Sequence, residues 1–200
     1  MVIGVLGGTF DPIHLGHYTL GNAALNEVGL DKLIVMPANI QPFKQNKRVS
    51  QDTHRLKMAE LAFENIPNVE VSDYEIKKGD ISYSYDTMMH LKSVYPNDEL
   101  FFITGTDSFI TIDRWYEGGK LLKNFSFIVS SRPGYPEREL DSKIRFYKED
   151  YGSKIIKLRT KMPDISSTEI REAALSGETI SHLVPVSVEK YIFENGLYED

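Results

Sequence analysis

Short apolar runs alternate with longer amphipathic stretches along most of the chain. The runs are rich in β-branched and aromatic residues and are bounded by turn residues, a pattern typical of buried strands. They predict strands at residues 2–6, 32–36, 69–71, 100–104, 125–130 and 155–158. Apolar positions at helical spacing follow most of these runs. They predict helices at residues 15–28, 52–65, 85–95, 107–113, 116–123, 137–150, 167–176 and 185–195.

This order of elements determines the expected fold. Strands that alternate with helices form βαβ units, which place the strands parallel in one sheet and pack helices against both of its faces. We therefore expect an α/β fold with a Rossmann-like, doubly wound, mainly parallel sheet, formed by residues 1–200 as a single domain. Ligands bind such sheets beyond the carboxyl ends of the strands, so functional residues are expected in the segments that follow each strand.

Composition and charge exclude several function classes. Apolar residues make up 41% and charged residues 26% of the 200 positions, which are ordinary globular values. The formal net charge of −6 argues against a nonspecific nucleic-acid binder, and the absence of cysteine excludes disulfides and thiolate chemistry. No run is long enough to span a membrane, and no targeting leader precedes the first strand. We therefore expect a cytoplasmic protein that binds neither nucleic acid nor membrane; its oligomeric state stays open, a homo-oligomer included.

The loop after the first predicted strand carries the strongest chemical pattern. It contains Gly7 and Gly8, and His14 and His17 follow at the first turn of the next predicted helix. Glycines let the backbone approach a phosphate closely, and a helix N-terminus presents unpaired N–H groups and a positive dipole end to the anion. A neutral or a charged imidazole placed there can donate to a phosphate oxygen. The loop is therefore predicted to bind a nucleotide phosphate.

Other ligand-binding patterns fit this loop less well. A dinucleotide-binding fingerprint needs an acidic residue at the end of the second strand, where this chain has Met36 and Pro37. No Gly-Lys-Ser/Thr sequence follows the glycines, which excludes a Walker A loop. A zinc site on His14 and His17 needs further ligands, and the other three histidines lie in unrelated contexts. We expect no protein-bound metal.

A second phosphate-binding candidate lies about 150 residues later. Residues 165–171, Ile-Ser-Ser-Thr-Glu-Ile-Arg, lead into a predicted helix. Serine or threonine before Glu169 is an N-capping pattern, and capping is compatible with phosphate binding. Arg171 lies one turn into the helix, so its planar guanidinium can reach back toward the N-terminus and clamp a phosphate.

Together, the two segments resemble a known superfamily. Gly-Gly-Thr-Phe-Asp-Pro-x-His-x-Gly-His and Ile-Ser-Ser-Thr-x-Ile-Arg resemble the nucleotidyltransferases of the T/H-x-G-H superfamily and, within it, the bacterial nicotinate-nucleotide adenylyltransferases. The resemblance covers essentially the whole chain, with support from residues 82–87, 105–107 and 131–134. It departs at residues 39–44, where the family commonly has Asn-Pro-Pro-His-Lys; this chain keeps Lys44 but has Phe43 at the histidine position.

The resemblance implies an activity. The family transfers the adenylyl group of ATP to nicotinate mononucleotide, which gives deamido-NAD and pyrophosphate in NAD biosynthesis, with Mg²⁺ carried by the ATP phosphates. A nucleotide 5′-phosphate is largely ionised at neutral pH, so direct in-line attack needs neither a protein base nor a covalent enzyme intermediate. The site must supply positioning and charge neutralisation. We expect His14, His17, Lys44 and Arg171 to do so, with His17 at the α-phosphate.

The resemblance also assigns the remaining ligand contacts. The expected ATP-binding positions are Gly7, Gly8, Thr9, Phe10, His14, His17, Arg132, Ile165, Ser166, Ser167 and Arg171. The expected positions for nicotinate mononucleotide are Lys44, Thr87, Asp107, Trp115 and Tyr116. Trp115 would stack on the nicotinate ring, and backbone groups near Thr87 and Tyr116 would contact its carboxylate. The residues alone also allow Trp115 as a core anchor and Asp107 as a helix N-cap.

Three further segments are expected to have structural roles only. Asp11 would hold the turn before Pro12. Residues 77–80 are predicted to form a turn. Tyr191 and Tyr198 are interpreted as packing or surface aromatics.

Two other functions stay open at this stage. A phosphopantetheine adenylyltransferase would share the fold, but that family usually has threonine at the position of His14, and this chain has Trp115 as a ring platform. A catalytically idle nucleotide-binding regulator would also keep the fold, although binding alone does not need every phosphate-neutralising residue. The sequence does not determine how strongly nicotinate is preferred over nicotinamide.

Overall fold

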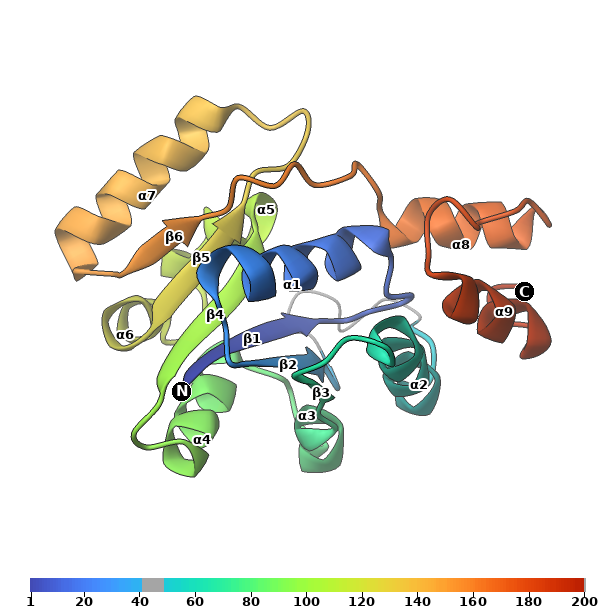
Figure 1. The fold of residues 1–200 in the computed structure, drawn as a ribbon, viewed down its shortest axis with the longest axis horizontal. Coiled ribbons are helices and arrows are strands. Elements are labelled where there is room, and N and C mark those ends of the chain that lie inside the picture. Colours follow the sequence, from blue (N-terminus) through green and yellow to red (C-terminus); the bar gives the residue numbers. More distant parts are fainter. Residues whose placement is uncertain (41–48, 200) are drawn as a thin grey trace.

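The strands form one parallel sheet in the computed structural model, which describes residues 1–40 and 49–199. Its order is β3-β2-β1-β4-β5-β6, and every neighbouring pair is parallel (Figure 1). The strands are β1 (Val2–Gly8), β2 (Lys32–Pro37), β3 (Val69–Val71), β4 (Glu99–Gly105), β5 (Ser126–Ser130) and β6 (Ile155–Lys157). The strand order changes direction between β1 and β4, which is where doubly wound sheets bind ligands. The predicted fold class is confirmed.

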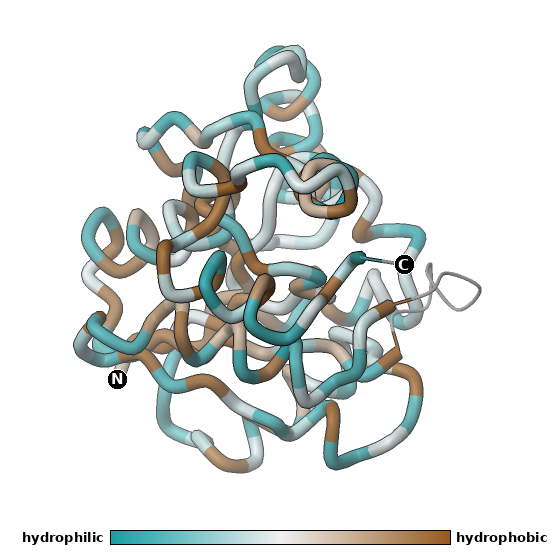
Figure 2. Tube along the Cα trace, turned by 90° about the vertical axis from the view of Figure 1, so that its right-hand side faces the viewer, coloured by the Kyte–Doolittle hydropathy of each residue, from teal (hydrophilic) through white to brown (hydrophobic). Residues whose placement is uncertain are grey.

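Helices cover both faces of the sheet. One face packs against α1 (Leu15–Val28), α2 (Asp52–Phe63), α8 (Ser167–Leu175) and α9 (Val186–Glu194). The other packs against α4 (Ser84–Val94), α5 (Thr106–Phe109), the 3₁₀ helix η2 (Ile112–Arg114), α6 (Gly118–Asn124) and α7 (Glu137–Tyr151). Successive strand residues point to opposite faces, so Leu6 and Ile103 enter the first core while Val5 and Phe102 enter the second. In Figure 2, hydrophobic residues concentrate in the inner segments and hydrophilic ones in the outer turns.

The observed elements differ from the predicted ones at short helices. The helix predicted at residues 107–113 is divided into α5 and η2, with residues 110 and 111 between them. The predicted strands are all present, each within two residues of its expected bounds. The turn expected at residues 77–80 is wrong in part, because Lys77 and Lys78 end helix α3 (Tyr74–Lys78). A helix of five residues is too short to display a helical period in the sequence. Its end is regular: Gly79, with φ of 75°, caps it in the left-handed conformation.

The sequence has no apolar run long enough to span a membrane, and the helices of the structure bear on the same point. Within residues 1–40 and 49–199, none of the helices is both long and apolar enough to cross a bilayer.

Candidate active site

Two neighbouring cavities open at the carboxyl ends of the strands. The larger, of about 430 Å³, lies among the loops after β1, β4 and β5 and the start of α8; we call it the polar cleft. The smaller, of about 130 Å³, is lined by Tyr83, Trp115 and Tyr116; we call it the aromatic pocket. Gly7 and Gly8, at the end of β1, line both cavities. A ligand with two parts can therefore occupy both.

The polar cleft gathers the residues that the sequence assigns to ATP. It is lined by Gly7, Gly8, Thr9, Phe10, His14, His17, Arg132, Ile165, Ser166, Ser167 and Arg171. Asp107, expected to contact the mononucleotide, also lines this cleft. Lys44, with its neighbour Phe43, lies outside the described residues. The expected convergence of the described residues at one sheet edge is observed.

Direct hydrogen bonds join the two sequence motifs. The Ser167 hydroxyl donates to the carbonyl of Pro12 at 3.0 Å. Nη1 of Arg171 donates to the carbonyl of Asp11 at 2.7 Å, although the two residues are 160 positions apart. Ser166 caps α8 by accepting from the backbone N–H of Glu169, as its sequence pattern predicts. The N-termini of α1 and α8 therefore meet at the polar cleft.

A capping box determines the protonation of both histidines. His14 is the N-cap of α1, and its Nδ1 accepts from the backbone N–H of Gly16 at 3.1 Å. Nδ1 of His17 accepts from the backbone N–H of His14 at 3.3 Å. A ring nitrogen that accepts carries no proton, so each neutral ring holds its proton on Nε2. The sequence left neutral and charged imidazoles open; the geometry selects neutral Nε2–H donors.

The electrostatic surroundings of His14 favour the same neutral form. Its side chain is buried, at 7% exposure. Burial and, to a smaller extent, the charge of Arg132 lower the pKa of His14 from 6.5 to about 4. Both causes disfavour a second proton on the ring. His14 is therefore a neutral donor at physiological pH.

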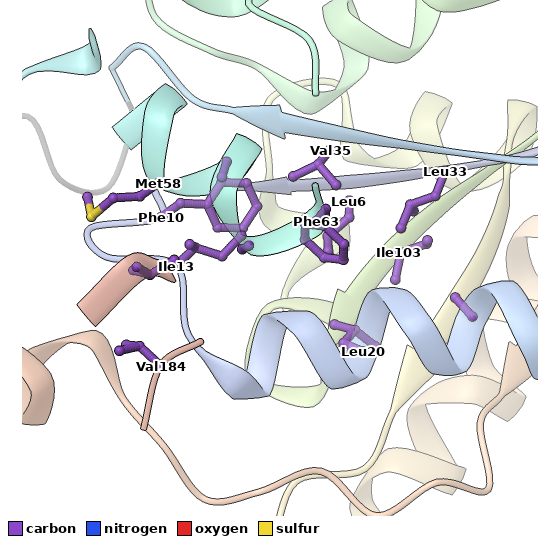
Figure 3. Close-up of a cluster of buried hydrophobic side chains, with 14 of the residues drawn as sticks. Leu6, Phe10, Ile13, Leu20, Leu33, Val35, Met58, Phe63, Ile103 and Val184 are labelled. Atoms are coloured by element: carbon purple, nitrogen blue, oxygen red, sulfur yellow. The ribbon is translucent and has the colours of Figure 1, made fainter. Parts of the chain in front are cut away.

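Packing against the core requires a glycine at position 8. A Cβ atom at Gly8 would lie 2.6 Å from the ring of Phe10. That ring is buried at 1% exposure, and Figure 3 shows Phe10 among the core side chains, near Ile13 and Met58. Phe10 therefore offers its backbone to the cleft, while its ring anchors the loop in the core.

Arg132 bridges two walls of the polar cleft. Nη1 donates to Oδ2 of Asp107 at 2.6 Å, and Nε and Nη2 donate to Oδ1 of Asp164 at 3.3 Å. Both carboxylates are more than half exposed, so these ion pairs are accessible to solvent. A phosphate that contacts Arg132 competes with two carboxylates for the guanidinium.

The aromatic pocket brings Trp115, Tyr116 and Thr87 together, as expected. The Trp115 ring packs edge-on against Phe102 at a centroid distance of 6.2 Å, and its Nε1 donates to Thr111 Oγ1. Trp115 is thus both a partial core anchor and a pocket wall. Tyr116, which is 52% exposed, lies against Tyr83 at 4.4 Å between ring centroids. The pocket presents aromatic surfaces suited to a flat ring.

A buried carboxyl group that the sequence did not indicate also lines this pocket. Glu75 is 7% exposed and accepts from the Thr87 hydroxyl at 2.5 Å. Burial raises the pKa of Glu75, although the Thr87 hydrogen bond opposes the shift. Glu75 lies on the short helix α3, which has no detectable period in the sequence, so nothing marked this glutamate as buried.

Arg55 is a second residue that sequence reasoning missed. It is 2% exposed, and its Nη1 donates to the carbonyls of Thr9 and Ala38 at 2.8 and 2.5 Å. Its Nε donates to the carbonyl of Ser50 at 3.1 Å. These bonds tie the loop after β1 to the segments after β2 and before α2. An arginine within a predicted helix carries no sign of this role.

A metal site formed by the protein alone needs several histidine, aspartate or glutamate side chains close together. In residues 1–40 and 49–199, no group of three or more histidine, aspartate or glutamate side chains could hold a metal ion. In this part of the chain, a divalent cation at the polar cleft would find at most two such side chains together, and oxygens of its ligand and of water would complete its coordination.

Comparison with known proteins gives consistent relatives. Residues 5–173 match the family described as Cytidylyltransferase-like. A probable nicotinate-nucleotide adenylyltransferase of Carboxydothermus hydrogenoformans is 39% identical over 196 residues, which cover 98% of this chain and 97% of the relative. The nicotinate-nucleotide adenylyltransferase of Bacillus subtilis is 38% identical over 199 residues, 98% of each chain.

Solved structures agree on the fold. Plasmodium falciparum nicotinic acid mononucleotide adenylyltransferase complexed with NaAD superposes with a TM-score of 0.81 at 22% identity, covering 98% of this chain and 97% of that one. The same enzyme complexed with APC superposes with a TM-score of 0.78 at 21% identity, covering 98% and 96%.

Proposed function

The chain belongs to the nicotinate-nucleotide adenylyltransferase family, and we propose that it transfers the adenylyl group of ATP to nicotinate mononucleotide. The products are deamido-NAD and pyrophosphate, in a step of NAD biosynthesis. The observation that carries this assignment is the contact of Arg171 with the Asp11 carbonyl, which joins both motifs at one cleft beside an aromatic pocket. A pure binding function would not call for this concentration of phosphate donors.

The polar cleft would hold the ATP phosphates. The capping bonds of His14 and His17 support a role for their Nε2–H groups as neutral donors, with His17 at the α-phosphate. Arg171, with Lys44 from the segment outside the described residues, would bind the phosphate tail. These groups neutralise charge as pyrophosphate leaves, and they do not act as bases.

The aromatic pocket would hold the pyridine ring of the second substrate. Trp115 would stack on the ring, and backbone N–H groups in the first turn of α4 and near Tyr116 would donate to the carboxylate. The N–H of Thr87 itself donates to the carbonyl of Tyr83 inside the helix, so earlier amides of α4 are better candidates. Asp107 would accept a hydrogen bond from a nucleotide hydroxyl, which would replace its bond from Arg132.

Mg²⁺ fits this site as an ion carried by the ATP phosphates. Mg²⁺ keeps several waters and takes one or two carboxylates together with substrate phosphates. Asp107, on the rim of the polar cleft, provides one exposed carboxylate and no closed cage. When bound, the ion supplies neutralisation of phosphate charge. The protein would act in the cytoplasm as one domain.

Pyrophosphate release from ATP tests the proposal. The protein is incubated with ATP, Mg²⁺ and either nicotinate mononucleotide, nicotinamide mononucleotide or phosphopantetheine. We expect release with nicotinate mononucleotide and formation of deamido-NAD. Release with phosphopantetheine alone would identify the sister adenylyltransferase activity. Failure with both pyridine mononucleotides would overturn the proposal.

A further inference from the structure

Tyr198, close to the C-terminal end, bonds to the turn that leads into the polar cleft. Its hydroxyl donates to Oδ1 of Asp11 at 2.8 Å, across 187 positions. Asp11 is only 5% exposed, and the backbone N–H of Ser50 donates to its other carboxylate oxygen at 3.3 Å. The buried carboxylate is therefore held by the C-terminal segment on one side and by the segment before α2 on the other. Asp11 was expected to hold the turn before Pro12, and its carboxylate instead accepts hydrogen bonds from two distant partners.

The backbone of Asp11 connects this anchor to the phosphate-binding residues. The Asp11 carbonyl accepts from Nη1 of Arg171 at 2.7 Å, and Nη2 of Arg171 donates to Thr168 Oγ1 at 3.2 Å. His14, the N-cap of α1, follows three residues after Asp11. A displacement of Asp11 therefore moves the acceptor of Arg171 and the approach to His14 together.

Asp11 and Arg171 also separate two cavities. Both residues line the polar cleft, and both line a cavity of about 590 Å³ to which residues 196–199 contribute. Figure 1 shows the C-terminal end between α8 and α9, on the side of the molecule where α1 begins. The C-terminal segment thus supports the cleft wall from behind.

The backbone conformation of Tyr198 indicates that the surrounding contacts hold this residue in place. Its φ is 70°, in the left-handed region that non-glycine residues rarely adopt. Such a conformation persists where the surrounding contacts over-determine it. Burial raises the pKa of Tyr198, and Asp11 adds to this shift, so the hydroxyl keeps its proton and remains a donor at neutral pH.

Resting on the proposed adenylyl transfer, we propose that Tyr198 is a positioning residue for the polar cleft: it holds Asp11, and the Asp11 carbonyl holds the guanidinium of Arg171 against the ATP phosphates. The competing explanation is packing alone, because Tyr198 also contacts the core on the α1 face of the sheet. The two explanations predict different kinetics.

Tyr198→Phe tests the proposal against a matched variant, Tyr191→Phe. Each change removes one hydroxyl from the C-terminal part of the chain. The Tyr191 hydroxyl lies 2.9 Å from Nδ1 of His54 on α2 and makes no contact with Asp11. ATP affinity is measured by calorimetry, which needs no turnover, and kcat and both KM values by pyrophosphate release. Thermal unfolding is recorded for both variants.

Tyr198→Phe should weaken ATP binding and lower kcat by about tenfold, the size of one hydrogen bond to a charged group. The KM for nicotinate mononucleotide should stay within about twofold, since stacking in the aromatic pocket is untouched. Tyr191→Phe should keep ATP affinity and kcat within about twofold. Equal losses in the two variants, or wild-type values for Tyr198→Phe, overturn the proposal.

A double-mutant cycle tests whether Tyr198 acts through Asp11. In an Asp11→Ala background, Tyr198→Phe should cause no further loss of ATP affinity beyond about twofold, because its acceptor is gone. A full additional tenfold loss would show that Tyr198 acts without Asp11 and would overturn the proposal. Calorimetry separates the proposed adenylyl transfer from the positioning role of Tyr198. Wild-type protein that binds ATP but adenylates no pyridine mononucleotide would contradict the proposed function. The effect of Tyr198→Phe on ATP affinity could still be measured in that case.

Discussion

The polar cleft and the aromatic pocket share Gly7 and Gly8 but are built on different principles. The polar cleft consists of loop backbone and helix N-termini, and its charged side chains already have partners, as Arg132 and Arg171 show. The aromatic pocket adds side chains from α3, α4 and the segment after η2 to residues of β1, β2 and β4, and together they surround a smaller space. We therefore expect the cleft to neutralise charge and the pocket to select a ring by its shape.

In both regions, burial favours the neutral form of a titratable group. It lowers the pKa of His14 in the polar cleft and raises the pKa of Glu75 in the aromatic pocket. In each case the neutral form is favoured, because a buried charge loses its hydration. The comparison teaches that burial shifts a titratable group of each cavity toward its neutral form.

Loss of the His17 imidazole should have the largest effect. We expect His17→Ala to lower kcat by about a hundredfold or more, because a donor to developing charge is removed from the polar cleft. The KM for nicotinate mononucleotide should change little, since the aromatic pocket is intact. Steady-state kinetics check this. Turnover within about threefold of wild type would remove His17 from the catalytic assignment.

The same variant needs a stability control. His17→Ala also removes the acceptor for the backbone N–H of His14, and losing such a cap costs about 1 kcal/mol of folding free energy. If the variant unfolds well above the assay temperature, the loss of kcat does not come from the loss of folding stability.

The pH dependence of stability should show the buried, neutral His14. Unfolded protein protonates this ring below its usual pKa of 6.5, while the folded protein does so only near pH 4. The unfolded state then binds more protons, so stability is full above pH 6.5 and is lost as the pH falls toward 4. The loss is on the order of 3 kcal/mol. Denaturant unfolding at several pH values measures it.

His14→Asn is the matched variant for this titration. Asparagine remains a good N-cap and does not titrate, so its pH curve should fall less steeply over the same range. The other titratable groups contribute equally to both proteins. Parallel curves for wild type and His14→Asn would contradict the low pKa of His14.

Trp115→Ala should separate the two regions kinetically. Loss of a stacking surface of about 1–3 kcal/mol should raise the KM for nicotinate mononucleotide by about 5- to 150-fold. The KM for ATP should remain within about twofold, since Trp115 does not line the polar cleft. Trp115→Phe should recover most of the loss. Equal increases in both KM values would show that the ring is only a core anchor.

Asp164→Asn should have the smallest effect. The Arg132–Asp164 pair is exposed, so its loss should change stability by less than about 1 kcal/mol. Because Asp164 competes with phosphate for Arg132, the KM for ATP should fall by about two- to fivefold. Glu70→Gln breaks the remote Lys32–Glu70 pair and serves as the control. A higher KM for ATP in Asp164→Asn would contradict this competition.

Much of the fold and of the polar cleft follows from local patterns. Strands β1, β2, β4 and β5 have apolar runs that bury both faces, and α1 has its cap and period in one continuous stretch. The polar cleft residues lie in two motifs, and βαβ geometry brings the ends of parallel strands to one edge. The aromatic pocket depends on elements with weak patterns. Helix α3 is too short to show a period, which concealed Glu75.

By itself, the sequence determined that the glycine loop with its two histidines and residues 165–171 meet at the carboxyl edge of a parallel sheet, and it predicts that they bind phosphate there. Only the tertiary structure decided how those groups are held. It selected the Nε2–H form of both histidines and joined Arg171 to Asp11. It also buried Arg55 and Glu75 and brought Tyr198 against Asp11. The reason is physical: residue spacing encodes the hydrogen bonds within a helix and the side-chain alternation of a strand, whereas contacts across 160 or 187 positions exist only after the helices pack on the sheet.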